Sequence, residues 1–134
     1  MKIEVPFGEV VDKISILTLK SHYITAASQR NHVATELATL RAAWSQAGFS
    51  AVETLPEWRD LHQVNHQLWR VEDALREHEH KQSFNQEFVA LARSVYQLND
   101  RRAALKRSIS VRLGSRLLEE KGYTGPHVSF THAP

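Results

Sequence analysis

The 134-residue chain contains no cysteine, which excludes disulfide bonds, thiolate metal ligands and cysteine nucleophiles. Only five glycines and four prolines interrupt it, and neither a glycine-rich phosphate loop nor a Gly-x-Ser-x-Gly nucleophile motif is present. No apolar run approaches the roughly 20 residues that cross a bilayer, and the first six residues lack an apolar signal core. These absences predict a soluble cytoplasmic protein of bacterial type that does not associate with membranes.

What the chain does have is helical periodicity along most of its length, whereas strand signals are nearly absent. Ser83 and Gln86 form a Ser-x-x-Gln capping box that predicts the start of the fourth helix. The pattern predicts an all-α fold, an antiparallel four-helix bundle with a short fifth helix over 115–121. We expect one bundle domain over 1–121 and an extended C-terminal tail over 122–134. The expected long helices cover 9–27, 28–47 (or from 31), 56–82 with a fraying end over 76–82, and 83–113.

Charge is unevenly distributed along the chain. Residues 1–80 carry eight Lys/Arg against eleven Asp/Glu, whereas residues 101–121 carry seven against two. The basic segment could meet phosphates, or it could meet the acidic helices of its own fold. We favour the internal explanation, because part of the positive charge lies on the apolar face of its helix. The arginines are spread around that helix instead of along one stripe, so nucleic-acid binding is not expected.

Polar residues interrupt the apolar face of the predicted fourth helix. Apolar residues recur at helical spacing from Phe88 to Leu113, yet Asn99, Arg102 and Lys106 fall on the same face. An interior cation is costly unless it is paired, hydrogen-bonded or within reach of water. A carboxylate from another helix, an anionic ligand or both should therefore meet Arg102 and Lys106.

A second polar ribbon runs beside the apolar seam of the predicted third helix. If the two ribbons face each other, Glu72 could pair with Arg102 or Lys106, and the excess cation could hold an anion such as a sugar phosphate or nucleotide sugar. In that reading Glu72 would balance charge or act as an acid/base catalyst. The predicted ligand-binding residues are Lys13, Asn65, Trp69, Arg76, Tyr96, Asn99, Arg102 and Lys106.

Two other interpretations stay open. The polar network could set helix register only, in a module that forms a homodimer through apolar residues such as Trp44, Phe49 and Trp58. Whether any reaction is catalysed also stays open. His62 and His66 have a usable metal-ligand spacing, but they face away from the apolar seam and no His-Glu-x-x-His motif is present. We therefore predict neither a metal site nor a cofactor.

Three segments resemble an uncharacterised bacterial family of all-helical domains of unknown function. They are GEVVDKISIL (8–17), VNHQLWRVEDALR (64–76) and ARSVYQLNDRRAALKR (92–107). The resemblance implies a compact cytosolic helical protein, and it links some members to cell-surface polysaccharide or glycosyltransferase contexts. It implies no activity, cofactor or catalytic residue. Its motifs coincide with the polar ribbons described above.

Overall fold

The computed structural model describes residues 1–123 and is all-helical, as predicted, with no strand in this part of the chain. It contains four α-helices and one short 3₁₀ turn. They are α1 (Phe7–Tyr23), α2 (Ala27–Gln46), η1 (Val52–Thr54), α3 (Trp58–His80) and α4 (Gln86–Arg112). None of the helices in the described residues is both long and apolar enough to cross a membrane.

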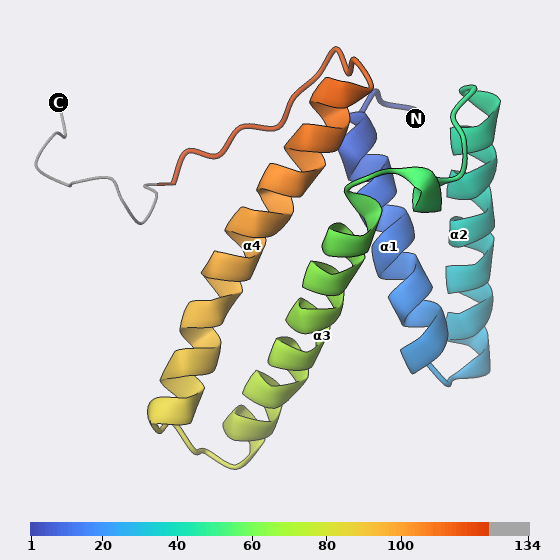
Figure 1. The fold of residues 1–134 in the computed structure, drawn as a ribbon. Helices are drawn as coiled ribbons and strands as arrows, with labels where there is room; N and C mark the ends of the chain where they lie inside the picture. The colour runs from blue at the N-terminus through green and yellow to red at the C-terminus, as the bar shows by residue number, and fades with distance from the viewer. Residues whose placement is uncertain (124–134) are drawn as a thin grey trace, which may run out of the picture.

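The chain reverses direction after each helix (Figure 1). α2 packs on α1, while α1, α3 and α4 pack on one another. The hairpin of α3 and α4 extends well beyond the end of α1 (Figure 1). The C-terminal end of α4 lies beside the start of α1 at one end of the molecule, and the described chain then runs on away from the N-terminus (Figure 1).

The hydrophobic core lies at this same end. Val11, Ile14, Leu61 and Ile109 are completely buried, and Trp44 of α2 covers them. Phe49 and Trp58 pack against this cluster as well. The expectation of an exposed apolar edge is therefore wrong for Trp44, which is buried, whereas Phe49 and Trp58 pack on the core and keep part of their surface exposed.

The first turn of α1 is held by the far end of the chain. Pro6 precedes the helix and offers no side-chain cap. Instead, the Phe7 N–H donates to Ser115 Oγ at 2.8 Å and the Gly8 N–H donates to Ser110 Oγ at 2.9 Å. This contact requires glycine, since a Cβ on Gly8 would lie 2.0 Å from the Lys106 carbonyl oxygen. α1 and α4 thus cross with their backbones in close approach.

The predicted N-cap of α4 is wrong by two residues. Asn85, not Ser83, caps the helix, and its Oδ1 accepts the Phe88 N–H at 3.0 Å. Gln82 adopts a positive φ of 53°, and the Ser83 N–H donates to the His78 carbonyl. Ser83 therefore belongs to the turn that ends α3 and is not available to start the next helix.

The predicted fifth helix over 115–121 is also wrong, since the described chain is not helical after Arg112. Gly114 has a φ of 74°, which ends α4. The following segment runs back along α4 with its charges paired, Glu119 to Lys106, Glu120 to Arg107 and Lys121 to Asp100. These pairs favour the extended path over a short isolated helix. Most of the predicted tail, residues 124–134, lies outside the described residues.

Candidate functional site

A buried ion pair between α1 and α4 is the centre of the polar network. Asp12 is completely buried, and Arg102 approaches it with two parallel donors, Nε to Oδ1 at 3.0 Å and Nη2 to Oδ2 at 2.5 Å. Asn65 of α3 donates to the same Oδ1 at 2.9 Å. The hydrogen bonds to Asp12 raise the pKa of Arg102 although burial opposes this. Such a two-pronged pair fixes the orientation of the guanidinium.

The network continues from Asn65 along α1 and α3. Asn65 also donates to Ser15 Oγ at 3.1 Å, and Ser15 Oγ shares a hydrogen bond of 2.9 Å with His62 Nδ1. Ser15 is completely buried, so this Ser–His contact cannot present a nucleophile to a substrate. His66 shares a hydrogen bond with the Tyr23 hydroxyl. The two histidines therefore face α1, which corrects the expectation that they point away from the seam.

Lys106 lies one turn further along α4 and is held between two carboxylates. Its side chain is 11% exposed, with Nζ 2.7 Å from Glu9 Oε2 and 2.9 Å from Glu119 Oε2. Burial disfavours the ammonium, but the hydrogen bonds to Glu9 and Glu119 outweigh it and raise the pKa of Lys106 above its ordinary value. Both interior cations of α4 thus meet carboxylates, as the cost of burying charge requires.

The carboxylates differ from those expected. Glu72 was predicted to pair with Arg102 or Lys106, but it is half-exposed and its Oε2 lies 3.6 Å from Arg76 Nη2. Asp12 takes the role instead. The signal that could have identified it is a stripe of small and polar residues on α1, in which Gly8, Asp12 and Ser15 share one buried face.

Two cavities adjoin Arg102. The α4 cavity, of about 780 Å³, lies between α4 and the segment that follows it. The α3 cavity, of about 420 Å³, lies between α1 and α3. Arg102 lines both. The α4 cavity is lined by Arg93, Val95, Tyr96, Asn99, Asp100, Arg102, Ala103, Lys106, Glu119, Lys121 and Tyr123. The α3 cavity is lined by Ile16, Asn65, Leu68, Trp69, Glu72, Asp73, Arg76 and Arg102.

The predicted site residues divide between these cavities. Tyr96, Asn99, Arg102 and Lys106 share the α4 cavity, whereas Asn65, Trp69, Glu72 and Arg76 line the α3 cavity with Arg102. The two predicted aromatic walls therefore belong to different cavities, and Trp69 stacks on Tyr23 with ring centroids 5.1 Å apart.

Lys13 lines neither cavity. Its Nζ lies 3.0 Å from Glu36 Oε1 on α2, because the side chain leaves α1 on the side that α2 covers. The prediction that Lys13 joins the cluster around Arg102 is therefore wrong.

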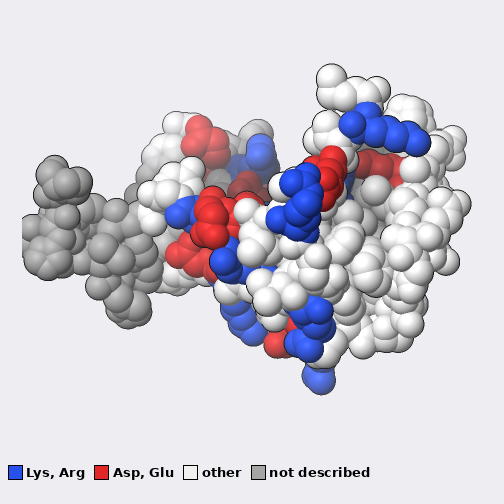
Figure 2. All heavy atoms as spheres, turned by 90° about the horizontal axis from the view of Figure 1, so that it is seen from above, with Lys and Arg blue, Asp and Glu red and all other residues white. Residues whose placement is uncertain are grey.

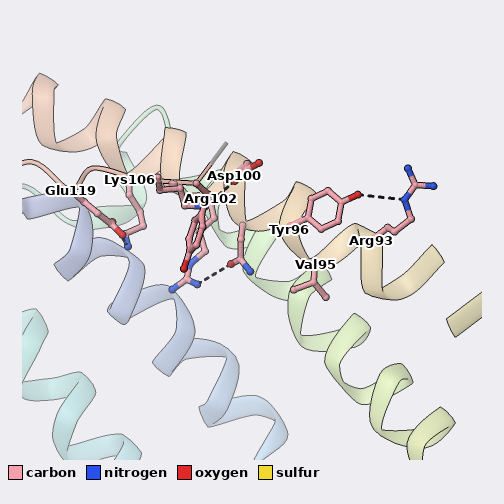
Figure 3. A pocket seen from close by; sticks show the side chains of 11 residues that line it. Arg93, Val95, Tyr96, Asp100, Arg102, Lys106 and Glu119 are labelled. Carbon is pink, nitrogen blue, oxygen red and sulfur yellow. Dashed lines mark hydrogen bonds and ion pairs between the residues drawn. The ribbon is translucent and has the colours of Figure 1, made fainter. Parts of the chain in front are cut away.

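Several residues of the α4 cavity were not predicted. Figure 3 shows Tyr96 with its hydroxyl directed toward Arg93, which donates to it at 3.4 Å, and Lys106 next to Glu119 at the other end. Lys121 Nζ lies 2.9 Å from Asp100 Oδ1. Tyr123 is 86% exposed and Tyr96 is 49% exposed. The residues after Gly114 escaped prediction because nothing in their pattern indicates that they fold back on α4.

The charges of residues 101–121 are largely neutralised within the fold, as the internal explanation expected. Arg102, Lys106, Arg112 and Arg116 pair with Asp12, Glu9, Glu57 and Glu4. Figure 2 shows acidic and basic side chains side by side over this end of the molecule, and no broad patch of one sign. Within residues 1–123 no three His, Asp or Glu side chains are grouped as a metal site would require.

A family model matches residues 1–133, and its description is "Family of unknown function (DUF6165)". The chain belongs to this family. The match confirms the resemblance to an uncharacterised helical family that the three motifs indicated. No curated protein matches the DUF6165 chain, and no solved structure matches it either. The site must therefore be interpreted from its own geometry.

Proposed function

We propose that this DUF6165 protein binds a small anionic molecule, of the sugar phosphate or nucleotide sugar class, in the α4 cavity. One observation carries the proposal: Asp12 holds only the inner edge of the Arg102 guanidinium. Nε and Nη2 donate to Asp12, while Nη1 makes only a long contact of 3.4 Å with Asn99, and the side chain stays 27% exposed. An arginine has five N–H donors, so its outer edge remains available to an oxyanion.

The rest of the cavity suits the body of such a ligand. Two tyrosine rings line it while remaining largely exposed, a combination that favours stacking on a sugar or base. Asn99 adds an amide that can donate to and accept from hydroxyl groups. The volume of about 780 Å³ lies within the range of small-molecule sites. Lys106 is already paired with Glu9 and Glu119, so Arg102 is the cation to which the anion would bind.

Glu72 stays a predicted acid/base residue rather than part of this binding proposal. Its side chain opens on the α3 cavity, so it could act only on a group held on that side of Arg102. Binding in the α4 cavity does not require it. Whether binding leads to a reaction is tested separately from binding itself.

The second candidate is a purely structural network, and the internal pairing of Arg102, Lys106 and Lys121 favours it. A buried network of this kind fixes the register of α1 against α4 without any ligand. The two candidates differ in what happens when an anion is added.

Thermal melting separates them. Inorganic phosphate, glucose 1-phosphate and UDP-glucose are added to the protein at matched ionic strength. Ligand at about 100 times Kd should stabilise the fold by about 2.7 kcal/mol. Arg102→Lys keeps a cation beside Asp12 but loses the paired donors of the planar guanidinium, so the ligand-induced rise in Tm should disappear. Arg101→Lys is the matched control, because Arg101 is exposed and does not line the α4 cavity.

Two outcomes contradict binding. If none of the three probes raises the Tm of the wild type, the structural network explains the residues. If Arg102→Lys and Arg101→Lys respond to UDP-glucose like the wild type, binding occurs elsewhere and the assignment to Arg102 is wrong.

A further inference from the structure

The distal half of the α3–α4 hairpin has no core of its own. Among the described residues no side chain between 66 and 108 is buried, although this segment carries apolar residues at helical spacing. Leu68 and Leu75 on α3, and Leu91 and Val95 on α4, are only half-buried. An apolar helix face is normally buried against another element. Two helices alone leave this seam partly open to water.

The exposed apolar face of α3 and α4 is continuous with the groove in which α1 packs near the core. α1 packs against both α3 and α4 near the core, where its own residues are completely buried. It ends at Tyr23, and the hairpin runs on past that point (Figure 1). The α3 cavity lies beside the second half of α1, between Ile16 and the α3 residues Leu68 and Glu72, and it extends along α3 to Arg76. The groove therefore lacks a helix where α1 stops.

The charged residues of α3 beside this groove could pair with the same residues of a second copy. Glu72 and Arg76 both line the α3 cavity, four residues apart, and are 51% and 80% exposed. Their mutual contact is loose, at 3.6 Å, and an exposed pair of this kind contributes little. In an antiparallel pair of α3 helices related by a twofold axis, each Glu72 would face the other Arg76.

We propose that a second copy of this chain covers the groove. The two α3 helices would lie antiparallel, with the twofold axis near Asp73 and Ala74, and the two hairpins would form a four-helix bundle. The geometry also brings the hairpin tip of one copy toward the end of α1 in the other. Phe84 at the tip is 52% exposed and Tyr23 at the end of α1 is 46% exposed, so each would gain a partner. This interface leaves the α4 cavity open.

Charge reversal tests the interface in the full-length protein. Analytical ultracentrifugation over a concentration series measures the dimer dissociation constant. Glu72→Arg places like charges across the axis twice and should weaken the dimer more than about tenfold. Adding Arg76→Glu restores opposite charges and should restore the dimer. Arg70→Glu is the matched control, because Arg70 is an exposed arginine that lines a separate cavity with Gln67 and Arg101.

Because the chain contains no cysteine, a single introduced cysteine provides a second test. Asp73→Cys places one thiol beside the axis, so mild oxidation should link two copies through a disulfide. Gln67→Cys, an exposed α3 position in that separate cavity, should link far less.

Three outcomes overturn the proposal. The first is a wild type that stays monomeric at every concentration, and the second is equal cross-linking of the two cysteine variants. The third is a dimer that forms only after residues 124–134 are removed, since that would assign the groove to the chain's own end.

Discussion

The buried Asp12–Arg102 pair allows a sharp test of how the network contributes to stability. Asp12 is completely buried, whereas 27% of the Arg102 side chain is exposed. Arg102→Leu leaves the carboxylate with Asn65 as its remaining side-chain donor, so we expect the free energy of unfolding to fall by about 3–5 kcal/mol. Asp12→Leu should cost less, because the freed guanidinium can turn toward solvent.

The double variant decides whether the loss comes from an uncompensated charge. Asp12→Leu with Arg102→Leu removes both ions, and we expect it to recover most of the loss of Arg102→Leu. Urea unfolding followed by circular dichroism measures all four proteins, with the m-value as a check that the transition is unchanged. Arg101→Leu, at the adjacent exposed position, should stay within about 0.5 kcal/mol of the wild type. An Arg102→Leu variant within about 1 kcal/mol of the wild type, or strictly additive losses, would refute this reasoning.

Three further predictions concern single positions. Gly8→Ala should destabilise the protein by about 2–3 kcal/mol in urea unfolding, because the new methyl group meets the α4 backbone; Gly122→Ala, with open space around it, should be nearly neutral. Asn85→Ala should cost about 1 kcal/mol and Ser83→Ala clearly less, and equal losses would contradict the N-cap assignment. Burial, with the charges of His66 and His22, lowers the pKa of His62, so the unfolded chain binds that proton more readily and stability is lost as pH falls below the ordinary value of 6.5. The urea midpoint should therefore drop between about pH 7.5 and about pH 5.5, and drop less in His62→Gln than in the wild type or in His80→Gln.

Helix content was predictable from the sequence, because apolar periodicity is a local property that survives packing. The inward direction of Arg102 and Lys106 was predictable for the same reason. The helix ends were harder to predict from the sequence. Both Ser83 and Asn85 can cap a helix, and only the positive φ of Gln82 decides between them.

The composition of the site depended on contacts between distant segments. Asp12 and Arg102 are separated by 90 positions, and nothing in either local pattern names the other. The expected partner Glu72 sits on an equally suitable helix, but Asp12 lies on the face of α1 that α4 covers. Residues 115–123 were assigned to a helix and a tail because no periodic pattern in their sequence indicates that they pair with α4. Such pairings become visible only when the fold is known.

The serines that complete the first turn of α1 have a consequence for biosynthesis. Ser110 and Ser115 lie 102 and 108 positions after the amides that they accept. A nascent chain emerging from the ribosome therefore cannot complete the first turn of α1 until residue 115 has been translated. Translation arrested before Ser110 would leave an N-terminal helix with a frayed beginning.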